Sequence, residues 1–471
     1  MKLKLLVGYL FFAYPVFTQE WQQIGNFNGA VIRLFTDTVD NLLYVGGVFR
    51  FNGTDTVNAV CIWDNNAILP MGNGLYDACG DPLCQSPGMF IRYKDEIYAG
   101  SYFDEIAGQP SSGIARWNGS QWLPVSPGLI DDSNDPGYAG GFYEHDGLLY
   151  TVGYFRWAGP DTANSVASWN GTAWQTYGTP EDTQHDLPIL TRTVFYKGEL
   201  YVGGNSYNFI DGNFNQDIMR YDGTAWHQVG SGLYGGSSFI NDMVIYHDEL
   251  YICGYFRGID GNAGNKIMRW NGEAWHDVGG GLCSPSALAN DMLVFEDKLY
   301  LVGNFTCVGD GVPANSIAVW DGTHWCSIGN STFDNTIGCI EIYNHEIYVG
   351  GGFTEVGGYA VNRFAKYIGD HSTDTCSATV SVTIEPQQAW RFAISPNPVK
   401  DQITISVSNI GLLSSAWRIF NAAGQEVTVL VHPVSTTEKQ LVLQVQGLQV
   451  GIYYLQWVGP AHIETAKFVK M

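Results

Sequence analysis

The feature that most constrains the fold of this chain is a repeat of about fifty residues. A Leu-Tyr or Ile-Tyr pair returns seven times, and the interval between successive pairs shortens steadily from 54 to 48 residues. The tyrosines of these pairs are Tyr44, Tyr98, Tyr150, Tyr201, Tyr251, Tyr300 and Tyr348. A repeat that cannot bury its own apolar face must stack against its neighbours, so the copies are expected to form one continuous architecture.

Each copy is predicted to contain four short strands. In the fifth copy they cover Asn241–Glu249, Leu250–Phe256, Lys266–Gly272 and Ala274–Gly279. The first two strands are joined by a tight link. The last two are joined after an Asn-Gly or Asp-Gly pair, which predicts a two-residue hairpin with positive φ at both positions. Four strands per unit at this period are typical of propeller blades.

The last copy lacks its fourth strand. The first three strands each occur seven times, but the fourth strand follows them only six times. Glu20–Gly29, near the N-terminus, matches the missing fourth strand. An N-terminal strand that completes the last copy would remove an open sheet edge. We therefore predict an all-β chain in which residues 19–371 form a seven-bladed β-propeller of four-stranded blades, closed by the N-terminal strand.

Several phrases resemble the kelch-like group of propellers. They are the "YVGG" of Tyr44–Gly47 and Tyr201–Gly204, the "YVGGG" of Tyr348–Gly352, and the aromatic residue that ends each third strand. The resemblance implies an architecture. It implies no particular activity, because propellers serve as binding proteins, scaffolds and enzymes.

The first eighteen residues are predicted to be a secretory signal peptide. Lys2 and Lys4 precede the short apolar run Leu5–Val16, and small residues stand before Gln19. The run is too short for a spanning helix, and no later segment is long and apolar enough, so no transmembrane segment is predicted. The formal charge of −23 disfavours nucleic acid and anionic membranes as partners.

Composition changes after His371. Residues 372–389 read as a polar linker, and residues 390–471 as a small β-sandwich of the immunoglobulin-like kind. This segment resembles the C-terminal sorting domain of the type IX secretion system. Its matching residues include Pro396, Asn397, Pro398, Gly451, Tyr453, Lys467 and Lys470. The resemblance implies partners in the translocon and in sortase-like machinery, and secretion or attachment at the outer-membrane surface of a Gram-negative, Bacteroidota-like bacterium.

Three loops depart most from the repeat, at Leu75–Met89, Leu129–Gly141 and Gly178–Leu190. Departures from a repeat are where a specific site is expected. The loops contain aromatic and acidic residues suited to polar ligands such as glycans. We take as candidate ligand-binding residues Tyr76, Asp131, Asp132, Asp135, Tyr138 and His185.

Nine cysteines fit an exported protein. Cys79 and Cys84 flank turn residues and are predicted to form a loop disulfide. Cys61, Cys253 and Cys339 fall in predicted strands and are expected to be buried. No cysteine or histidine spacing suits zinc.

Asp211–Asp217 has alternating oxygen ligands of the kind that hard cations use. The next copy carries Lys266 where this one carries Asp217, which favours a turn. We predict no metal and no cofactor.

A polar residue stands five positions before the aromatic residue of each third strand, and it is expected to close a loop onto backbone. The likeness of the copies favours a non-catalytic binding protein for glycans or proteins. Two alternatives stay open, an extracellular carbohydrate-active enzyme on a propeller scaffold and a structural surface-layer component. Unpaired carboxylates at the central pore would favour the enzyme.

Overall fold

A computed structural model describes residues 19–75, 87–103, 105–106, 109–183, 187–210, 212–235, 238–369, 392–407, 416–421, 425–428, 431–437, 440–458 and 463–471. The chain divides into two compact units, Met1–Ala378 and Thr379–Met471.

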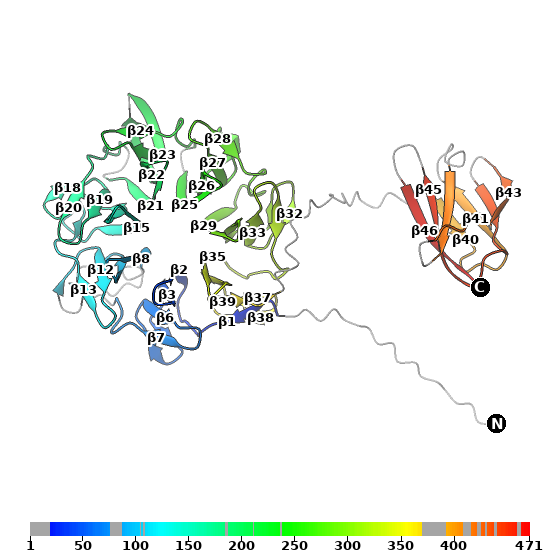
Figure 1. The fold of residues 1–471 in the computed structure, drawn as a ribbon, viewed down its shortest axis with the longest axis horizontal. Coiled ribbons are helices and arrows are strands. Elements are labelled where there is room, and N and C mark those ends of the chain that lie inside the picture. The colour runs from blue at the N-terminus through cyan, green and yellow to red at the C-terminus, as the bar shows by residue number, and fades with distance from the viewer. Residues whose placement is uncertain are drawn as a thin grey trace, which may run out of the picture. The chain divides into compact units, whose positions relative to one another are not determined.

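The N-terminal unit is built from four-stranded antiparallel sheets set around a common centre (Figure 1). Seven such sheets occur among the described residues of this unit. The first four sheets contain β2 (Val31–Asp37), β3 (Leu42–Gly47), β6 (Val60–Trp63) and β7 (Ile68–Pro70); β8 (Met89–Tyr93), β9 (Glu96–Gly100), β12 (Ile114–Trp117) and β13 (Trp122–Pro124); β15 (Tyr138–His145), β16 (Leu148–Tyr154), β19 (Val166–Trp169) and β20 (Trp174–Thr176); and β21 (Ile189–Tyr196), β22 (Glu199–Ile210), β23 (Asn213–Tyr221) and β24 (Trp226–Gln228).

The other three sheets follow the same order. They contain β25 (Phe239–Tyr246), β26 (Glu249–Tyr255), β27 (Ile267–Trp270) and β28 (Trp275–Asp277); β29 (Leu288–Phe295), β30 (Lys298–Asn304), β33 (Ile317–Trp320) and β34 (Trp325–Ser327); and β35 (Ile337–Tyr343), β36 (Glu346–Gly351), β39 (Phe364–Tyr367) and β1 (Trp21–Gln23). The four-strand prediction for each copy therefore holds for these sheets.

The loops between these strands contain further short strands. They are β4 (Phe51–Asn52) with β5 (Asp55–Thr56), β10 (Glu105–Ile106) with β11 (Gln109–Pro110), β14 (Leu129–Ile130) with β17 (Trp157–Ala158) and β18 (Asp161–Thr162), β31 (Cys307–Val308) with β32 (Val312–Pro313), and β37 (Glu355–Val356) with β38 (Tyr359–Ala360). One 3₁₀ turn, η2, covers Gly258–Asp260. The described residues contain no α-helix.

The core of this unit lies between neighbouring sheets. One buried cluster joins Cys253 and Ile267 of one sheet to Leu299, Leu301 and Ala318 of the next. The first strand of each sheet lies nearest the centre (Figure 1). No sheet can bury its apolar face alone, so stacking of the copies supplies most of the stabilisation.

The two kinds of hairpin differ in their turns. In six of the seven first-to-second-strand links both central residues take positive φ, as at His247 and Asp248, and the β2–β3 link is longer, with positive φ at Asn41 alone. After the third strand the link is four residues long, because Trp270 pairs with Trp275. Here only the glycine, Gly272, has positive φ, so the prediction of positive φ at both positions is wrong. The preceding Asn271 instead accepts hydrogen bonds at its side-chain oxygen from the backbone N–H groups of the turn, both at 2.8 Å.

The N-terminal strand β1 pairs with β39, with Trp21 opposite Tyr367. Their ring centres are 5.0 Å apart, and Trp21 is 1% exposed. The same aromatic contact, at 5.2 Å, joins Trp270 to Trp275 in another sheet. The carboxylate of Glu20 also accepts hydrogen bonds from the backbone N–H groups of Asn330 and Ser331, both at 2.9 Å.

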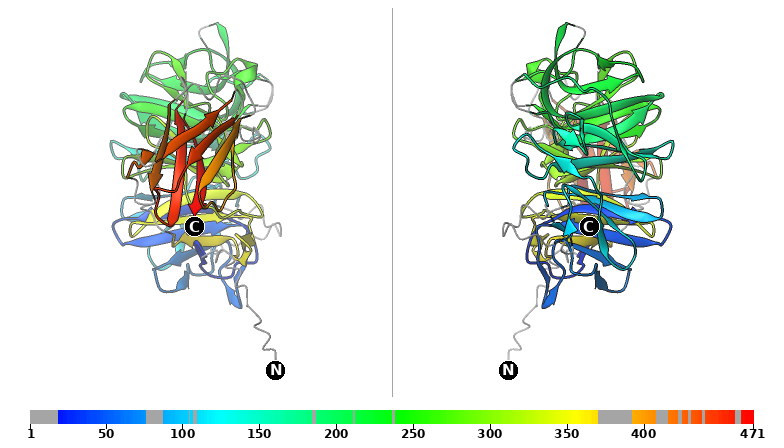
Figure 2. Two further views of the ribbon diagram at one scale, coloured as in Figure 1. Left: turned by 90° about the vertical axis from the view of Figure 1, so that its right-hand side faces the viewer. Right: turned by 90° about the vertical axis from the view of Figure 1, so that its left-hand side faces the viewer.

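The C-terminal unit contains two antiparallel sheets whose strands appear in orange and red in Figure 2. One holds β40 (Phe392–Ser395), β41 (Gln402–Val407), β44 (Gln440–Gln444) and β43 (His432–Thr436); the other holds β42 (Ala416–Asn421), β45 (Gly451–Val458) and β46 (Ile463–Lys470). Buried residues of both sheets share one core, among them Ile403, Leu443, Ile419 and Phe468. The alternation in the sequence predicted short antiparallel strands here, and the described residues form them.

Candidate functional site

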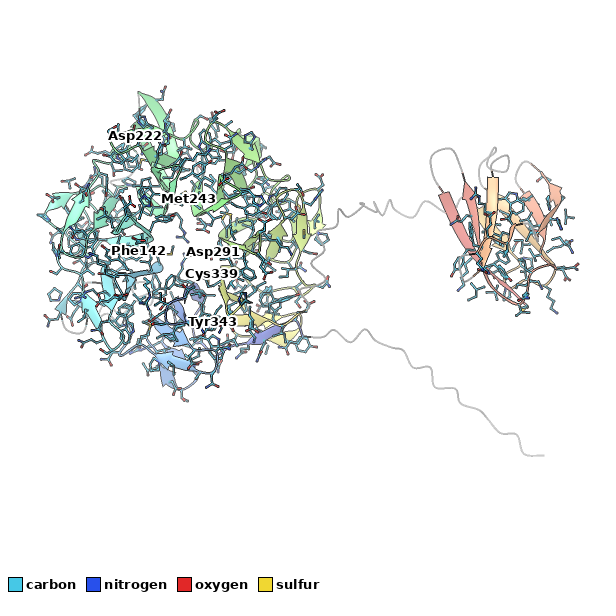
Figure 3. All side chains as sticks on the ribbon, viewed as in Figure 1. Phe142, Asp222, Met243, Asp291, Cys339 and Tyr343 are labelled. Atoms are coloured by element: carbon cyan, nitrogen blue, oxygen red, sulfur yellow. A yellow bond between two sulfur atoms is a disulfide. The ribbon has the colours of Figure 1, made fainter. Side chains whose placement is uncertain are left out.

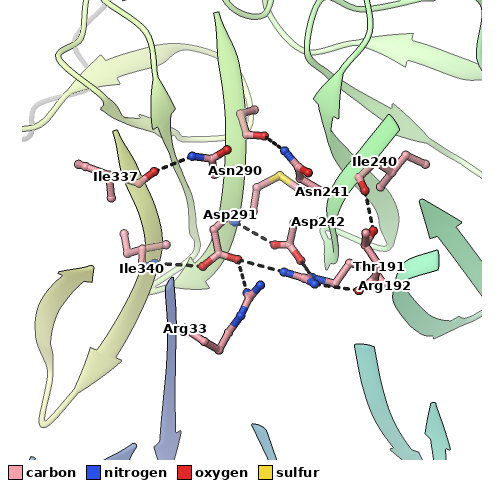
Figure 4. Close-up of polar contacts among 12 residues, drawn as sticks. Arg33, Thr191, Arg192, Ile240, Asn241, Asp242, Asn290, Asp291, Ile337 and Ile340 are labelled. Carbon is pink, nitrogen blue, oxygen red and sulfur yellow. Dashed lines mark hydrogen bonds and ion pairs between the residues drawn. The ribbon is translucent and has the colours of Figure 1, made fainter. Parts of the chain in front are cut away.

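Six of the seven innermost strands of the N-terminal unit carry a β-bulge, an irregularity that re-aims the neighbouring side chains, and β8 pairs with β9 without one. The residue after the bulge is charged in four strands, giving Arg33, Arg192, Asp242 and Asp291, which we call the central charge cluster (Figure 4). The residue pairs that flank the bulges are Val31/Arg33, Ala139/Gly141, Leu190/Arg192, Ile240/Asp242, Ala289/Asp291 and Ile337/Cys339. Figure 3 places Asp291 and Cys339 near the common centre and Asp222 at the outer edge.

The four charges of the cluster pair with one another. Arg192 Nε donates to Asp242 Oδ1 at 2.7 Å, and both side chains are less than a tenth exposed. Asp291 Oδ1 lies 3.4 Å from Arg33 Nη1 and 3.9 Å from Arg192 Nη2. Strands that are far apart in the sequence thus meet through opposite charges.

The two carboxylates also accept backbone hydrogen bonds from the next sheet. Asp242 Oδ2 accepts from the N–H of Met292 at 2.8 Å, and Asp291 Oδ2 accepts from the N–H of Ile340 at 3.0 Å. Hydrogen bonds to an ionised group are stronger than neutral ones. Each aspartate therefore ties its own innermost strand to the following one.

A second row of contacts runs beside the cluster (Figure 4). The residues inside the bulges donate to backbone carbonyls of the next innermost strand. The contacts are Thr191 Oγ1 to Ile240 O at 2.6 Å, Asn241 Nδ2 to Ala289 O at 2.8 Å, and Asn290 Nδ2 to Ile337 O at 2.8 Å. From β21 to β35 the innermost strands are thus joined by side chains as well as by packing.

Burial changes the acidity of groups near the cluster. Burial and, next, the charge of Asp242 raise the pKa of Asp291, although Arg33 and Arg192 oppose this rise. Burial raises the pKa of Glu341 to about 7, while a hydrogen bond from the Ile342 N–H opposes it. Burial also raises the pKa of the Cys339 thiol well above its ordinary value.

The arrangement suits a structural role better than catalysis. A general acid or base needs a carboxyl group within reach of substrate. Asp242 and Asp291 instead face arginines and backbone N–H groups of the protein. Among the described residues no group of three metal-ligating side chains comes together.

A half-buried pocket lies elsewhere, where the loop after β24 meets the loop between β26 and β27. Its volume is about 150 Å³, and it is lined by Tyr234, Gly235, Ser238, Tyr255, Phe256, Arg257 and Asp260. We call it the β25–β26 pocket. Arg257 and Asp260 form a two-point ion pair, with Nε to Oδ2 at 2.8 Å and Nη2 to Oδ1 at 3.0 Å.

The rim of this pocket is held in place by Asn262. Asn262 accepts from the N–H of Tyr234 and donates to the Tyr234 carbonyl, both at 2.9 Å. Gly235 has φ of +104°, and a Cβ there would lie 2.9 Å from a carboxylate oxygen of Asp260. The two loops therefore touch, and Tyr234, at 44% exposure, presents its ring beside the opening.

The floor of the pocket connects to a buried acid. Ser238 Oγ donates to Asp217 Oδ2 at 2.5 Å, and the N–H of Ser206 donates to Asp217 Oδ1 at 3.1 Å. Burial raises the pKa of Asp217 to about 7 despite these hydrogen bonds. A carboxyl group that keeps its proton near neutral pH is less costly to bury than an ion.

The candidate residues from the sequence do not form one site in the described part of the chain. Asp131 Oδ1 accepts from the N–H groups of Ser133 and Asp135 within its own turn. Asp132 pairs with Arg156, at 2.9 Å to Nη2. Asp135 is exposed.

Of the aromatic candidates Tyr76, Tyr138 and His185, the structure describes Tyr138. Tyr138 begins β15 and stacks on Tyr102 with ring centres 4.8 Å apart. Burial raises the pKa of Tyr138, and the charges of Arg33 and Arg192 oppose that rise. Tyr76 and His185 lie outside the described residues, so their assignment stays a prediction.

The β25–β26 pocket was missed because its loops look like ordinary copies of the repeat. One signal was present. The aligned phrases "DGNFNQD" and "DGNAGNK" place Asp217 and Lys266 at the same register. Opposite charges at one repeat position mark a place where the copies have diverged.

The recurring polar residue before the third strand has a structural contact, as predicted. Its acceptor, however, lies in the loop after the fourth strand, where Asn58 donates to Asn73 O and Asn164 donates to Thr179 O. Gln216 donates to Gly235 O at 2.6 Å, which ties this residue to the pocket.

The described cysteines differ in burial and in bonding. Cys61, Cys253 and Cys339 are buried and free, as the sequence predicted. A disulfide joins Cys283 to Cys307, a pairing that the sequence did not suggest. Cys79 and Cys84 lie outside the described residues, and their disulfide stays a prediction.

In the C-terminal unit the predicted sorting residues gather around the last strand. Asn397, between Pro396 and Pro398, donates to the Lys467 carbonyl at 3.0 Å and accepts from the N–H of Val469 at 2.9 Å. Gly451 begins β45 and pairs with Lys470 in β46, where Tyr453 stacks on Phe468. The Ser-Pro-Asn-Pro phrase therefore holds the C-terminal strand by its backbone.

Comparison with known proteins identifies this second unit. The model of the secretion system C-terminal sorting domain matches residues 393–471. No curated protein matches the chain. A solved structure titled "Structure of YjhT" matches with 13% identity and a TM-score of 0.35, covering 59% of this chain and 92% of that chain.

Residues 393–471 are thus a sorting domain, and they indicate export by the type IX secretion system. The domain implies interaction with that machinery and secretion or a cell-surface location in a bacterium of the Bacteroidota type. In the part of the chain that the structure describes, no helix has the length and apolarity needed to cross a membrane.

Proposed function

We propose that the N-terminal unit is a closed seven-bladed propeller that binds a glycan or protein ligand without catalysis. In this proposal residues 1–18 are the signal peptide, and residues 372–389 link the propeller to the sorting domain. Pairing of β1 with β39 and burial of Trp21 support the closure. The ligand meets the face that carries the loops after β24 and between β26 and β27.

The β25–β26 pocket is the observation that carries the binding proposal. It combines an exposed aromatic ring, Tyr234, with polar groups that are already fixed by the protein. A pocket with preset polar groups and an aromatic wall is the usual form of a small-ligand site. At about 150 Å³ it suits one small unit of a larger ligand, such as a single sugar.

The central charge cluster supports a non-catalytic role. Its carboxylates, which the enzyme alternative would need free, bind Arg33, Arg192 and backbone N–H groups instead. A charged centre of this kind stabilises the scaffold on which the loops are presented.

A glycan and protein array probed with the full chain tests this function. We expect binding that Tyr234→Ala weakens by about tenfold or more, because stacking of the ring on the ligand is lost. The matched control is Tyr359→Ala, which removes a tyrosine of similar exposure, 39%, from a loop strand of another sheet. Equal loss in both variants, or no binding on either array, would refute the proposal.

A further inference from the structure

Cys326 carries a disulfide bond whose partner lies outside the described residues. It is the middle residue of β34, the outermost strand of its sheet, and is 5% exposed. The other five described cysteines are excluded as its partner, because three are free and two are bonded to each other. Of the nine cysteines in the chain, three candidates remain, namely Cys79, Cys84 and Cys376.

Burial distinguishes Cys326 from the residues that other copies carry at the same register. The second residue of the fourth strand is exposed or half-buried in the other six sheets, where it is Gln22, Leu69, Leu123, Gln175, His227 or His276. Successive side chains of a strand point to opposite faces. Trp325 packs in a cluster with the preceding sheet, whereas Cys326 packs in the cluster that contains residues of β1 and β39. Cys326 therefore faces the last sheet.

The last strand of that sheet ends close to Cys326. Tyr367, the final residue of β39, belongs to the same buried cluster. The N–H of the next residue, Ile368, donates to the Glu20 carbonyl at 2.8 Å. The carboxylate of Glu20 accepts from the N–H of Asn330, in the loop that follows β34, at 2.9 Å. Glu20 thus contacts both the chain that leaves β39 and the loop that begins just after Cys326.

The length of the intervening chain favours Cys376 as the partner. Eight residues lead from Ile368 to Cys376, and they span up to about 27 Å when extended. The compact N-terminal unit also extends to Ala378, past Cys376.

The two other candidates lie in a different part of the unit. Cys79 follows Leu75 by four residues, and Leu75 is buried in a cluster between the first two sheets. The sheet of β35 and β39 separates the first sheet from the sheet of β34 (Figure 1). A disulfide between Cys79 and Cys84, as the sequence predicts, leaves Cys376 for Cys326.

We propose that Cys326 and Cys376 form a disulfide that fastens the start of the linker to the outer strand of the sixth sheet. The two thiols lose two protons and two electrons as the S–S bond forms. A disulfide oxidant takes up both and is reduced to two thiols. Export through the bacterial periplasm exposes the chain to such oxidants. This inference is independent of the ligand proposed above.

The cross-link has two consequences. It joins the sixth sheet to the chain that leaves the last one, and it restricts the unfolded chain, so it stabilises the unit. It also determines what a cut in the linker releases. A cut after Cys376 frees the sorting domain, whereas a cut between Tyr367 and Cys376 leaves that domain attached through the disulfide.

Peptide mapping of the full chain, purified without reductant, tests the pairing. Free thiols are blocked with iodoacetamide in urea, and the chain is then digested with trypsin. Cys376 is the one cysteine of the tryptic peptide 367–391, and Cys326 lies in the peptide 299–363. By mass spectrometry we expect 367–391 to be linked to 299–363 and to be released by reductant. A blocked and unlinked 367–391 peptide, or its linkage to any other peptide, would overturn the inference.

Two variants assign the link within peptide 299–363. Cys326→Ala should release 367–391 from this peptide, because the partner thiol is lost. The matched control is Cys339→Ala, which removes a buried free cysteine from the same peptide and should leave the link intact. A link that survives in Cys326→Ala, or disappears in Cys339→Ala, would assign the bond to another cysteine and refute the proposal.

A measurement on the other partner keeps the inference testable if Cys326→Ala does not fold. Without reductant, Cys376→Ser should lower the melting temperature of the full chain by a few degrees, because the cross-link is lost. The neighbouring Ser377→Ala is the control and should leave it unchanged. Equal melting temperatures for Cys376→Ser and the unaltered chain would count against the bond. The glycan and protein arrays are scored separately, so failure here leaves the proposed function standing.

Discussion

Charged side chains are buried both in the central charge cluster and beside the β25–β26 pocket, but the partners of these charges differ. At the centre, Arg192 and Asp242 satisfy each other at 2.7 Å, and backbone N–H groups complete the shell. Behind the pocket residue Tyr255, Lys266 is buried with that aromatic ring as its neighbour and no acceptor among the described residues. The first charges hold sheets together, whereas the last one has the Tyr255 ring as its neighbour.

The contrast separates structural from functional charge in a repeat protein. Where sheets meet at the centre, the register of four bulges brings opposite charges together across copies. Where loops meet at the rim, the copies have diverged. The partners of a buried charge therefore indicate its role. Burying a charge without a partner costs free energy of folding, so such a charge needs another compensating contact.

Starting the chain at Asn26 instead of Gln19 should have the largest effect on stability. It removes β1 and the fully buried Trp21, and it exposes the edge of β39. The melting temperature of a chain that starts at Asn26 should fall below that of any point variant described here. This result would mean that the central charge cluster cannot hold the sheets alone. An unchanged melting temperature would contradict closure by β1.

Asp242→Ala should follow in size. It leaves Arg192 buried without its nearest partner and leaves the N–H of Met292 without its acceptor. Breaking one side of a buried pair costs about 3–5 kcal/mol of unfolding free energy. Urea unfolding measures the loss, and exposed Asp161→Ala is the control. A loss as small as that of the control would show that the cluster does not join the sheets.

Asp217 should make stability depend on pH. Its pKa is about 7 in the folded protein and near the ordinary value of 3.8 when unfolded. Over this window the unfolded state releases its proton first, so this residue's stabilising contribution is lost as the pH rises from about 4 to 7. Thermal unfolding of Asp217→Asn should therefore show a smaller decline between pH 5 and pH 8 than the unaltered protein. Identical pH profiles would count against a raised pKa.

Lys266→Met should have the smallest effect on stability. The substitution removes a buried ammonium and keeps a side chain of similar length, so the unfolding free energy should equal that of the unaltered protein or exceed it. Arg192→Met is the paired comparison and should lose several kcal/mol in the same urea assay. Similar losses in both variants would erase the distinction between the cluster and the pocket.

Much of the fold could be predicted from the chain alone, because local patterns determine it. The tyrosine period, the turn glycines and the match of Glu20–Gly29 to a missing strand anticipated the sheets and the pairing partner of β1. The Ser-Pro-Asn-Pro phrase and the last strand anticipated the sorting domain at 393–471. The four-residue turns were mispredicted because an asparagine or aspartate side chain competes with the backbone for the turn N–H groups.

The candidate site was harder to predict because it depends on contacts between copies. Arg33 and Asp291 are 258 residues apart and meet only once the sheets are arranged around their centre. The pocket depends on Asn262 bridging to Tyr234 across two loops. The register of Lys266 with Asp217 was visible, but burial decides whether such a charge has a partner, and burial follows from the packed structure.

The most direct test of this account is the protonation of Lys266, followed by NMR of isotope-labelled lysine side chains in the full chain. We predict a pKa of about 8 for Lys266, because burial without a hydrogen-bond acceptor disfavours the ammonium form. A Lys266 pKa at the ordinary lysine value of 10.5 would contradict the claim that this charge is buried without an acceptor among the described residues.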